Sequence, residues 1–375
     1  MVYLDYSATT QPDIEVLKVF NTVSIENFAN ANSIHKFGVS SKKLIEQATK
    51  NICAKLNIKE KELIYTSGAS ESNNLAIKGI CNKYGDNKRK HIITTKLEHS
   101  SVISVLNFLS FKNFEIDFVN LLEDGTVDLE NLKSLVKDET LLVTICAVDS
   151  EIGIRQPIEK IGEILKNHPN CYFHSDITQC IGKDTINLEN VDLASFSGHK
   201  IFCFKGIGGL YKKENIILEP LIHGGKSTSV YRSGTPQNEL ICSLSKAFDL
   251  SFNKLEEKKE YVLKLNAMLR ENLSKYEGIY FNSNNKSISN VLNISILNIK
   301  PEDFLFKLEE YDIFVSTKSA CSKTEESSVA VLALTNNKDL ASSSIRISLS
   351  YKTTIEEINY FLEKFDICYN TLKGV

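Results

Sequence analysis

The segment that organises this chain, residues 195–211, reads SFSGHKIFCFKGIGGLY. It follows the apolar run 191–194, which is typical of a short buried strand, and its glycine cluster leads into a second short strand at 210–211. Lys200 is therefore expected in a loop, close to Ser197 and His199. A desolvated lysine in such a loop can form a Schiff base, and the two neighbours suit an anion beside it. The alternative is an ordinary surface lysine, and the rest of the chain must decide.

The overall composition is that of a globular protein. The chain has 375 residues, enough for two domains, with 42% hydrophobic and 24% charged residues. A net charge of -3 gives no reason to expect nucleic-acid binding or an anionic membrane as partner. The N-terminus MVYLDYSATT lacks the basic and apolar regions of a signal peptide. We therefore expect a cytoplasmic protein without membrane segments.

The nine cysteines are spread singly, and none forms a C-x-x-C pair. This spacing argues against a disulfide framework and against a structural metal site, so no metal is expected. Most of the cysteines have apolar neighbours and are interpreted as small buried side chains. Cys321 differs because serine, lysine and glutamate surround it.

Strands and helices are predicted to alternate from residue 63 to residue 174. Strands are expected at 63–65, 91–95, 114–119, 141–148 and 171–174. Helices are expected at 100–109, 129–136 and 157–166, and another follows the turn 66–74 and continues through residues 75 and 80. Nearly continuous apolar strands in this order predict an α/β fold with a mainly parallel sheet covered on both faces. Ligands then belong at the carboxyl ends of the strands, and the small-residue turn 66–74 is a candidate anion site at a helix N-terminus.

The composition changes beyond residue 236. An amphipathic helix at 255–276 is followed by strands at 291–297, 313–317 and 345–350 and by helices at 301–311 and 354–369, whereas 282–285 is interpreted as a surface turn. We expect a large domain of residues 1–254 and a smaller α+β domain of residues 255–375, with the segment 1–14 packing on the smaller one.

Polar residues at two predicted strand ends are candidates for catalysis. Asp176 could hold a pyridinium nitrogen protonated, with Gln179 near the ring oxygen, although a helix N-cap is the commoner role of such an aspartate. His99 could stack on a ring and move protons, although a lone histidine there is more often a loop residue.

Together these segments resemble a known family. In order, the stretches YLDYSATT, ANANSIHKFG, YTSGASESNNLAIKG, TTKLEHSSV, HSDITQCIGK, SGHKIFCFKGIGGLY and YRSGT are similar to the motifs of cysteine desulfurases of the NifS and IscS type. These enzymes belong to the class V aminotransferases among the fold type I enzymes that use pyridoxal 5'-phosphate. The resemblance runs from Tyr3 to about Phe361.

The resemblance implies a role for each matching residue. Lys200 would hold pyridoxal 5'-phosphate covalently and remove the substrate's Cα proton, with Asp176, Gln179 and His99 around the ring. Thr235 would reach the phosphate of the other subunit, which implies a homodimer with shared active sites. Cofactor-phosphate contacts would come from Ala69, Ser70, Ser197 and His199, a further cofactor contact from Ser150, and substrate contacts from Arg346 and Asn32.

The implied activity is the removal of sulfur from L-cysteine. Cys321, in the motif SACS, would attack the sulfur and carry it as a persulfide to an acceptor such as an iron–sulfur scaffold or a thiolation acceptor, and L-alanine would be the other product. The positively charged neighbours Lys318 and Lys323 would favour its thiolate form.

The sequence also departs from the family. Asp149 and Ser150 stand where the family has two asparagines, which brings an acid near the anionic substrate and shortens a contact. Phe204 replaces a proline and Ser70 a threonine. Two alternatives therefore stay open: a related enzyme such as a selenocysteine lyase, and a desulfurase-like partner protein without activity.

Overall fold

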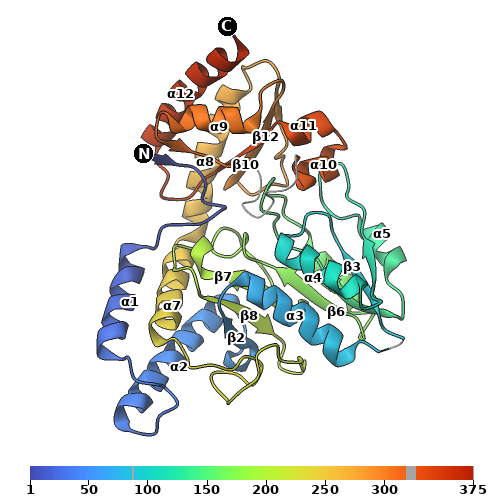
Figure 1. The fold of residues 1–375 in the computed structure, drawn as a ribbon, viewed down its shortest axis with the longest axis vertical. Coiled ribbons are helices and arrows are strands. Elements are labelled where there is room, and N and C mark those ends of the chain that lie inside the picture. Colours follow the sequence, from blue (N-terminus) through green and yellow to red (C-terminus); the bar gives the residue numbers. More distant parts are fainter. Residues whose placement is uncertain (87, 318–326, 375) are drawn as a thin grey trace.

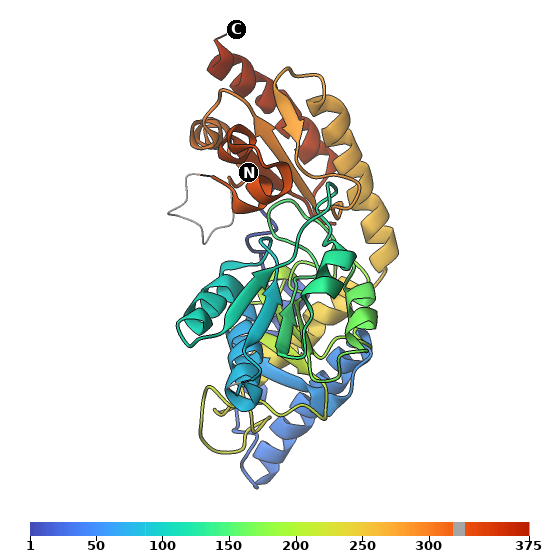
Figure 2. The same ribbon diagram turned by 90° about the vertical axis from the view of Figure 1, so that its right-hand side faces the viewer.

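The computed structural model describes residues 1–86, 88–317 and 327–374, so the predicted catalytic Cys321 lies outside the described residues. Two bodies follow one another along the long axis of the molecule (Figures 1 and 2). A large α/β body carries the middle of the chain, and a smaller α+β body carries the C-terminal part.

The large body is built on one twisted sheet. Its strands are β2 (Leu63–Thr66), β3 (His91–Thr94), β4 (Glu115–Phe118), β5 (Thr140–Thr144), β6 (Tyr172–Asp176), β7 (Leu193–Ser197) and β8 (Gly208–Lys212). They lie in the order β2-β8-β7-β6-β5-β3-β4. Among these described strands, β8 pairs antiparallel with both β2 and β7, and the remaining pairs are parallel, which confirms the predicted mainly parallel sheet.

Helices cover both faces of this sheet because its strands are apolar on both sides. One face packs against α3 (Ala69–Tyr84) and α4 (Ser100–Ser110). The other packs against α2 (Lys36–Leu56), α5 (Leu129–Leu135), α6 (Ile158–Leu165) and α7 (Asn238–Phe252). Helix α1 (Ile14–Glu26) lies beside α7 at the outer edge (Figure 1).

The smaller body has its own core. Strands β9 (Ile279–Phe281), β10 (Val291–Ile296) and β12 (Ser344–Ser348) form an antiparallel sheet against α8 (Leu255–Leu273), α9 (Pro301–Glu309) and α12 (Ile355–Lys373). Two short helices, α10 (Val329–Thr335) and α11 (Lys338–Ser342), pack toward the loop 152–154 of the large body. A boundary near residue 255 remains our proposal for the division into domains.

The N-terminal segment joins the two bodies. Strand β1 (Val2–Tyr3) pairs with β11 (Ile313–Phe314), and the side chain of Leu4 lies in the core of the smaller body. The chain then runs along β12, where the backbone N–H of Ser7 donates to Ser348 Oγ at 2.9 Å. At Thr10 it reaches the large body, through hydrogen bonds with His199 and Phe202. Residues 2–10 therefore form a strap between the bodies.

Two details of the fold differ from the sequence analysis. Helix α7 was not predicted, although it buries Ile241, Leu244 and Phe248 against the large sheet. The interpretation of residues 282–285 as a surface turn was wrong for its first half, because Asn282 is buried and its amide donates to Asn293 Oδ1 and Ser295 Oγ, both at 2.7 Å. Among the described helices, none combines the length and apolar character that crossing a membrane requires.

Candidate active site

A cavity of about 350 Å³ opens at the carboxyl ends of the parallel strands, where ligands bind in folds of this type. Strand β6 ends at Asp176 and β7 at Ser197, so both side chains are delivered to this edge by the sheet itself. The cavity wall includes most of the residues predicted from the sequence: Ala69, Ser70, His99, Ser150, Asp176, Gln179, Ser197, His199, Lys200 and Arg346.

One end of the cavity suits an anion. The first turn of α3 begins there at Ala69, and the free backbone N–H groups of a helix N-terminus attract negative charge. The preceding Gly68 has φ = 148°, a conformation that favours glycine, and a Cβ there would lie 3.2 Å from Ser197 Oγ. The nearby carboxylate of Glu71 is neutralised by Arg232, whose Nε lies 2.9 Å from Glu71 Oε1. A phosphate at this end of the cavity would therefore meet backbone N–H donors, and the negative charge of Glu71 would not repel it because Arg232 neutralises that charge.

Asp176 is buried at the end of β6. Its Oδ1 accepts a hydrogen bond from the backbone N–H of Thr178 at 3.0 Å, so the carboxylate does cap the following turn. Its Oδ2 accepts from Asn73 Nδ2 at 2.8 Å. A carboxylate oriented in this way lines the cavity and can face a protonated ring nitrogen.

The amine of Lys200 meets the strap. Its Nζ donates to the carbonyl oxygen of Ser7 and to that of Ala8, the latter at 2.7 Å. Gln179 Nε2 donates to the same Ser7 oxygen at 3.0 Å, and its Oε1 accepts from Lys183 Nζ at 2.6 Å. Burial, together with the neighbouring charge of Lys200, lowers the pKa of Lys183 to about 7. The strap thus supplies acceptors to two predicted cofactor residues.

His99 caps helix α4, which agrees with the local role that a histidine after a strand commonly has. Its Nδ1 accepts from the backbone N–H of Ser101 at 3.2 Å and lies 2.8 Å from Ser101 Oγ. Burial lowers the pKa of His99 most, and Asp176 opposes this shift. The other ring nitrogen, Nε2, is the one left for a ligand in the cavity.

Arg346 projects into the cavity from β12 of the smaller body, where it is 1% exposed. Its Nη2 donates to Asp5 Oδ1 at 2.7 Å and its Nη1 to the carbonyl oxygen of Ser150 at 2.8 Å. Within the described part of the chain, Nε has no hydrogen-bond partner. Because a guanidinium binds a carboxylate through two parallel N–H groups, Arg346 is a candidate for binding a carboxylate in this cavity.

Asp149 lies in the cavity wall, as expected from its place beside Ser150, but its charge is used locally. Its Oδ1 accepts from the backbone N–H of Glu151 at 2.9 Å and of Ile152 at 2.8 Å, and its Oδ2 accepts from Ile154 at 2.6 Å. Burial nevertheless raises its pKa to about 6. The carboxylate thus accepts hydrogen bonds from the loop 151–154 that follows it, and this explains how an acid is tolerated beside an anion site.

Three predicted residues are not part of this cavity as described. Thr235 and Asn32 are exposed and do not line it. Cys321 lies outside the described residues. Their roles remain predictions.

The structure also adds residues that the sequence analysis did not single out. Asn73 and Ser101 contact Asp176 and His99, and Asp5 contacts Arg346. Asp5 had a local signal, because it is an acidic residue in an otherwise apolar and aromatic segment. Asn73 had none, since its partners Ser101 and Asp176 are far away in the sequence.

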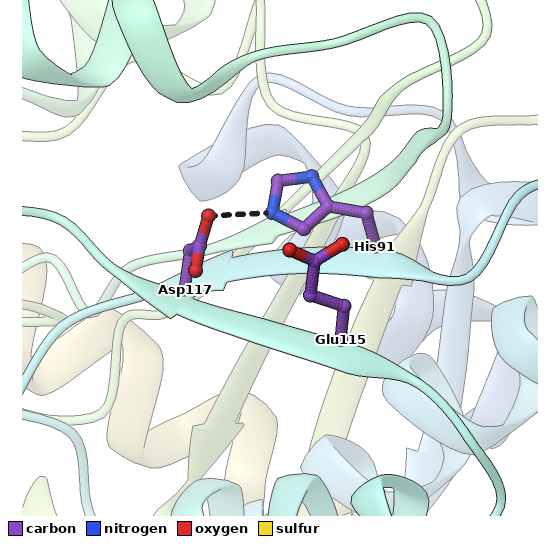
Figure 3. A group of neighbouring side chains, drawn as sticks. All are labelled: His91, Glu115 and Asp117. Carbon is purple, nitrogen blue, oxygen red and sulfur yellow. Dashed lines mark hydrogen bonds and ion pairs between the residues drawn. The ribbon is translucent and has the colours of Figure 1, made fainter.

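One group with the spacing of metal ligands lies elsewhere, on β3 and β4 (Figure 3). His91 Nε2 is 3.1 Å from Asp117 Oδ2 and its Nδ1 is 2.8 Å from Thr140 Oγ1, while Glu115 pairs with Lys137 at 3.3 Å. Hydrogen bonds and ion pairs within the protein account for each of these groups. We assign no metal to them.

Comparisons with known proteins agree with this geometry. The family model described as aminotransferase class-V matches residues 2–361. The chain is 38% identical over 367 residues to the cysteine desulfurase IscS of Rickettsia prowazekii, covering 96% of this chain and 88% of that protein. A solved NifS-like protein superposes with a TM-score of 0.93 at 33% identity over the whole of both chains. A structure described as SspA in complex with cysteine gives 0.83 at 29% identity, covering 94% of this chain and 100% of the other.

Proposed function

Because the chain belongs to the aminotransferase class-V family, we propose that it is a cysteine desulfurase that uses pyridoxal 5'-phosphate. Its substrate is L-cysteine, and its products are L-alanine and a persulfide on Cys321. The carrying observation is that Lys200, Asp176, His99 and Arg346 line a single cavity although they come from distant parts of the chain. The IscS relatives and the cysteine complex of SspA support the choice of substrate.

The cavity fits the cofactor in size and in donor set. The α3 N-terminus, Ser197 and His199 would hold the phosphate, Asp176 the ring nitrogen and Gln179 the ring oxygen. Arg346 in the cavity wall would provide the guanidinium for the substrate carboxylate. When bound, pyridoxal 5'-phosphate supplies an electron sink that weakens bonds at the substrate's Cα and Cβ.

The protein's own groups then do the remaining work. Arg346 fixes the substrate carboxylate, Lys200 takes the Cα proton, and His99 moves protons to and from the leaving groups. The Cys321 thiolate forms a bond to the substrate sulfur while the bond between that sulfur and Cβ breaks. The electron pair of the broken carbon–sulfur bond stays with the carbon skeleton, which gains protons and leaves as alanine.

Incubation with L-cysteine tests this function. We expect one added sulfur atom on Cys321 by mass spectrometry, alanine in equal amount, and free sulfide once a thiol reductant is present. The Cys321→Ala variant should form no persulfide, because Cys146, the cysteine of the described cavity wall, is buried and burial raises the pKa of its thiol. Alanine release that survives in this variant with selenocysteine, but not with cysteine, would favour the selenocysteine lyase. Cofactor-loaded protein that releases no alanine from either substrate would reject an enzymatic function.

We also propose that two copies share their active sites. Thr235 and Asn32 lie outside their own chain's cavity, as residues that serve a partner subunit would. Large apolar side chains are exposed nearby in the chain: Ile25, Phe28, Ile34, Ile222 and Val230. Burial of such side chains against a second copy would stabilise a dimer.

Sedimentation equilibrium should therefore return twice the 42.2 kDa of one chain. Thr235→Ala should weaken pyridoxal 5'-phosphate binding about tenfold, since a phosphate hydrogen bond is worth roughly 1.5 kcal/mol. Tyr280→Ala, an exposed change in the smaller body, is the matched control. A monomer that binds the cofactor fully would contradict the shared site.

The acceptor of the persulfide is proposed to be a protein thiol, such as that of an iron–sulfur scaffold. We propose action in the cytoplasm, where thiols stay reduced. In support, the described cysteines are free, and most of them are buried.

A further inference from the structure

A short chain of hydrogen bonds connects Asp176 to His99 behind the cavity. Asn73, in the second turn of α3, is fully buried. Its Nδ2 lies 2.8 Å from Asp176 Oδ2 and 2.9 Å from Ser101 Oγ. Ser101 Oγ in turn lies 2.8 Å from His99 Nδ1. The side-chain amide of Asn73 thus contacts both Asp176 and the Ser101 hydroxyl, which in turn contacts His99.

The direction of the first two bonds follows from chemistry. Asp176 carries acceptor oxygens only, so the amide group facing it must be the NH₂ of Asn73. Turning the amide over would place Oδ1 against the carboxylate. Both hydrogens of the NH₂ are then used, one for Asp176 and one for Ser101. Oδ1 is left buried without a partner among the described residues.

The direction of the last bond follows from the first two. Ser101 Oγ accepts from Asn73, and its one hydrogen is therefore available for His99 Nδ1. The backbone N–H of Ser101 also points at this nitrogen, at 3.2 Å, and a backbone N–H can only donate. Two donors at Nδ1 require a lone pair there, which leaves the proton of the neutral ring on Nε2.

We propose that Asn73 and Ser101 are positioning residues that fix His99 as the neutral tautomer with its proton on Nε2. At the start of each turnover His99 therefore presents an N–H hydrogen-bond donor, and not a lone pair, to the cavity. The role of His99 during turnover rests on the proposed function, whereas the tautomer is a property of the protein alone.

The surrounding charges do not determine the tautomer. Asp176 and Glu151 favour a protonated ring, while Lys200 opposes it, and burial opposes it most. Together these groups lower the pKa of His99 but do not choose between its two nitrogens. The two donors of Ser101 determine the tautomer, because a proton on Nδ1 would face both the backbone N–H and the hydroxyl hydrogen of Ser101.

Nuclear magnetic resonance of full-length protein labelled with ¹⁵N-histidine tests the proposal without cysteine. The His99 signals are assigned with His99→Gln, and spectra are recorded with and without pyridoxal 5'-phosphate. We expect Nδ1 to be unprotonated in the neutral ring. Ser101→Ala should raise the pH midpoint of His99 protonation by about 0.5 unit, a threefold change, since one donor to the neutral form is lost.

Two matched variants separate positioning from simple packing. Ser101→Thr keeps the hydroxyl and should restore the wild-type midpoint, and Ser100→Ala, at the neighbouring position, should leave it unchanged. A proton on Nδ1 in the wild type, or an unchanged midpoint in Ser101→Ala, would overturn the proposal. If Ser101→Ala does not fold, the wild-type tautomer alone decides. Inactive protein that shows the expected tautomer would count against the proposed function and not against this inference.

Discussion

Replacement of Lys200 by alanine is expected to lower alanine formation from L-cysteine at least ~10³-fold. The amine is proposed both to hold the cofactor and to take the Cα proton, and a positioned general base alone contributes about 10²–10⁴ in rate. The variant should also lose the yellow absorbance of lysine-bound pyridoxal 5'-phosphate, and its Cys321 should stay unmodified. Alanine release and absorbance spectra measure both effects.

The same substitution should loosen the strap. Ser7 and Ala8 would lose the donor that Lys200 Nζ supplies to their carbonyl oxygens, which costs roughly 1–3 kcal/mol of unfolding free energy. Lys264→Ala, an exposed change on α8, is the control and should alter neither activity nor stability. A small primary amine added to Lys200→Ala should restore part of the activity. Turnover within tenfold of the wild type would exclude Lys200 as the base.

The sequence predicted the part of the fold that follows from local pattern. Apolar strands alternating with helices indicated the parallel sheet, and strand ends at Asp176 and Ser197 indicated where ligands bind. Parallel strands bring their carboxyl ends to one edge, so residues far apart in the chain were expected to meet there. This is why the cavity wall contains most of the predicted residues.

The sequence did not predict features that depend on distant partners. Asn282 looks like a turn residue because asparagine favours turns, yet it is buried by hydrogen bonds to β10. No side-chain hydrogen bond caps the N-terminus of helix α7, and burial against the large sheet stabilises the helix instead. Asp149 was expected to bring an acid near the anionic substrate and does line the cavity, but backbone N–H groups of its own loop donate hydrogen bonds to its carboxylate. In each case the contacts that the residues make in the folded protein, rather than the residue types, determine the local structure.

Arg346 shows how such a distant partner shapes the site. Asp5 of the strap holds one edge of the guanidinium, and the carbonyl oxygen of Ser150 holds one further N–H group. These contacts orient the planar side chain in the cavity wall. Ser150 thus contributes through its backbone, which a change from asparagine to serine does not remove.

Arg346→Lys is therefore expected to reduce kcat/KM for L-cysteine about 100-fold, mainly through a higher KM. Lysine keeps the charge but lacks the two parallel N–H groups, and losing one charge-assisted hydrogen bond costs roughly 1.5–3 kcal/mol. Steady-state kinetics at several cysteine concentrations measure the change. Arg346→Leu should in addition lower the unfolding free energy by about 3–5 kcal/mol, because Asp5 then lacks its ion-pair partner in a largely buried site.

The control for this prediction is Arg270→Lys, because Arg270 also lies partly buried in the smaller body but contacts Asn266 and Ser283, away from the cavity. It should leave KM unchanged. Asp5→Asn combined with Arg346→Leu should recover part of the lost stability without recovering activity, since it removes the unpaired charge but not the need for a carboxylate receptor. An unchanged KM in Arg346→Lys would show that the substrate carboxylate binds elsewhere.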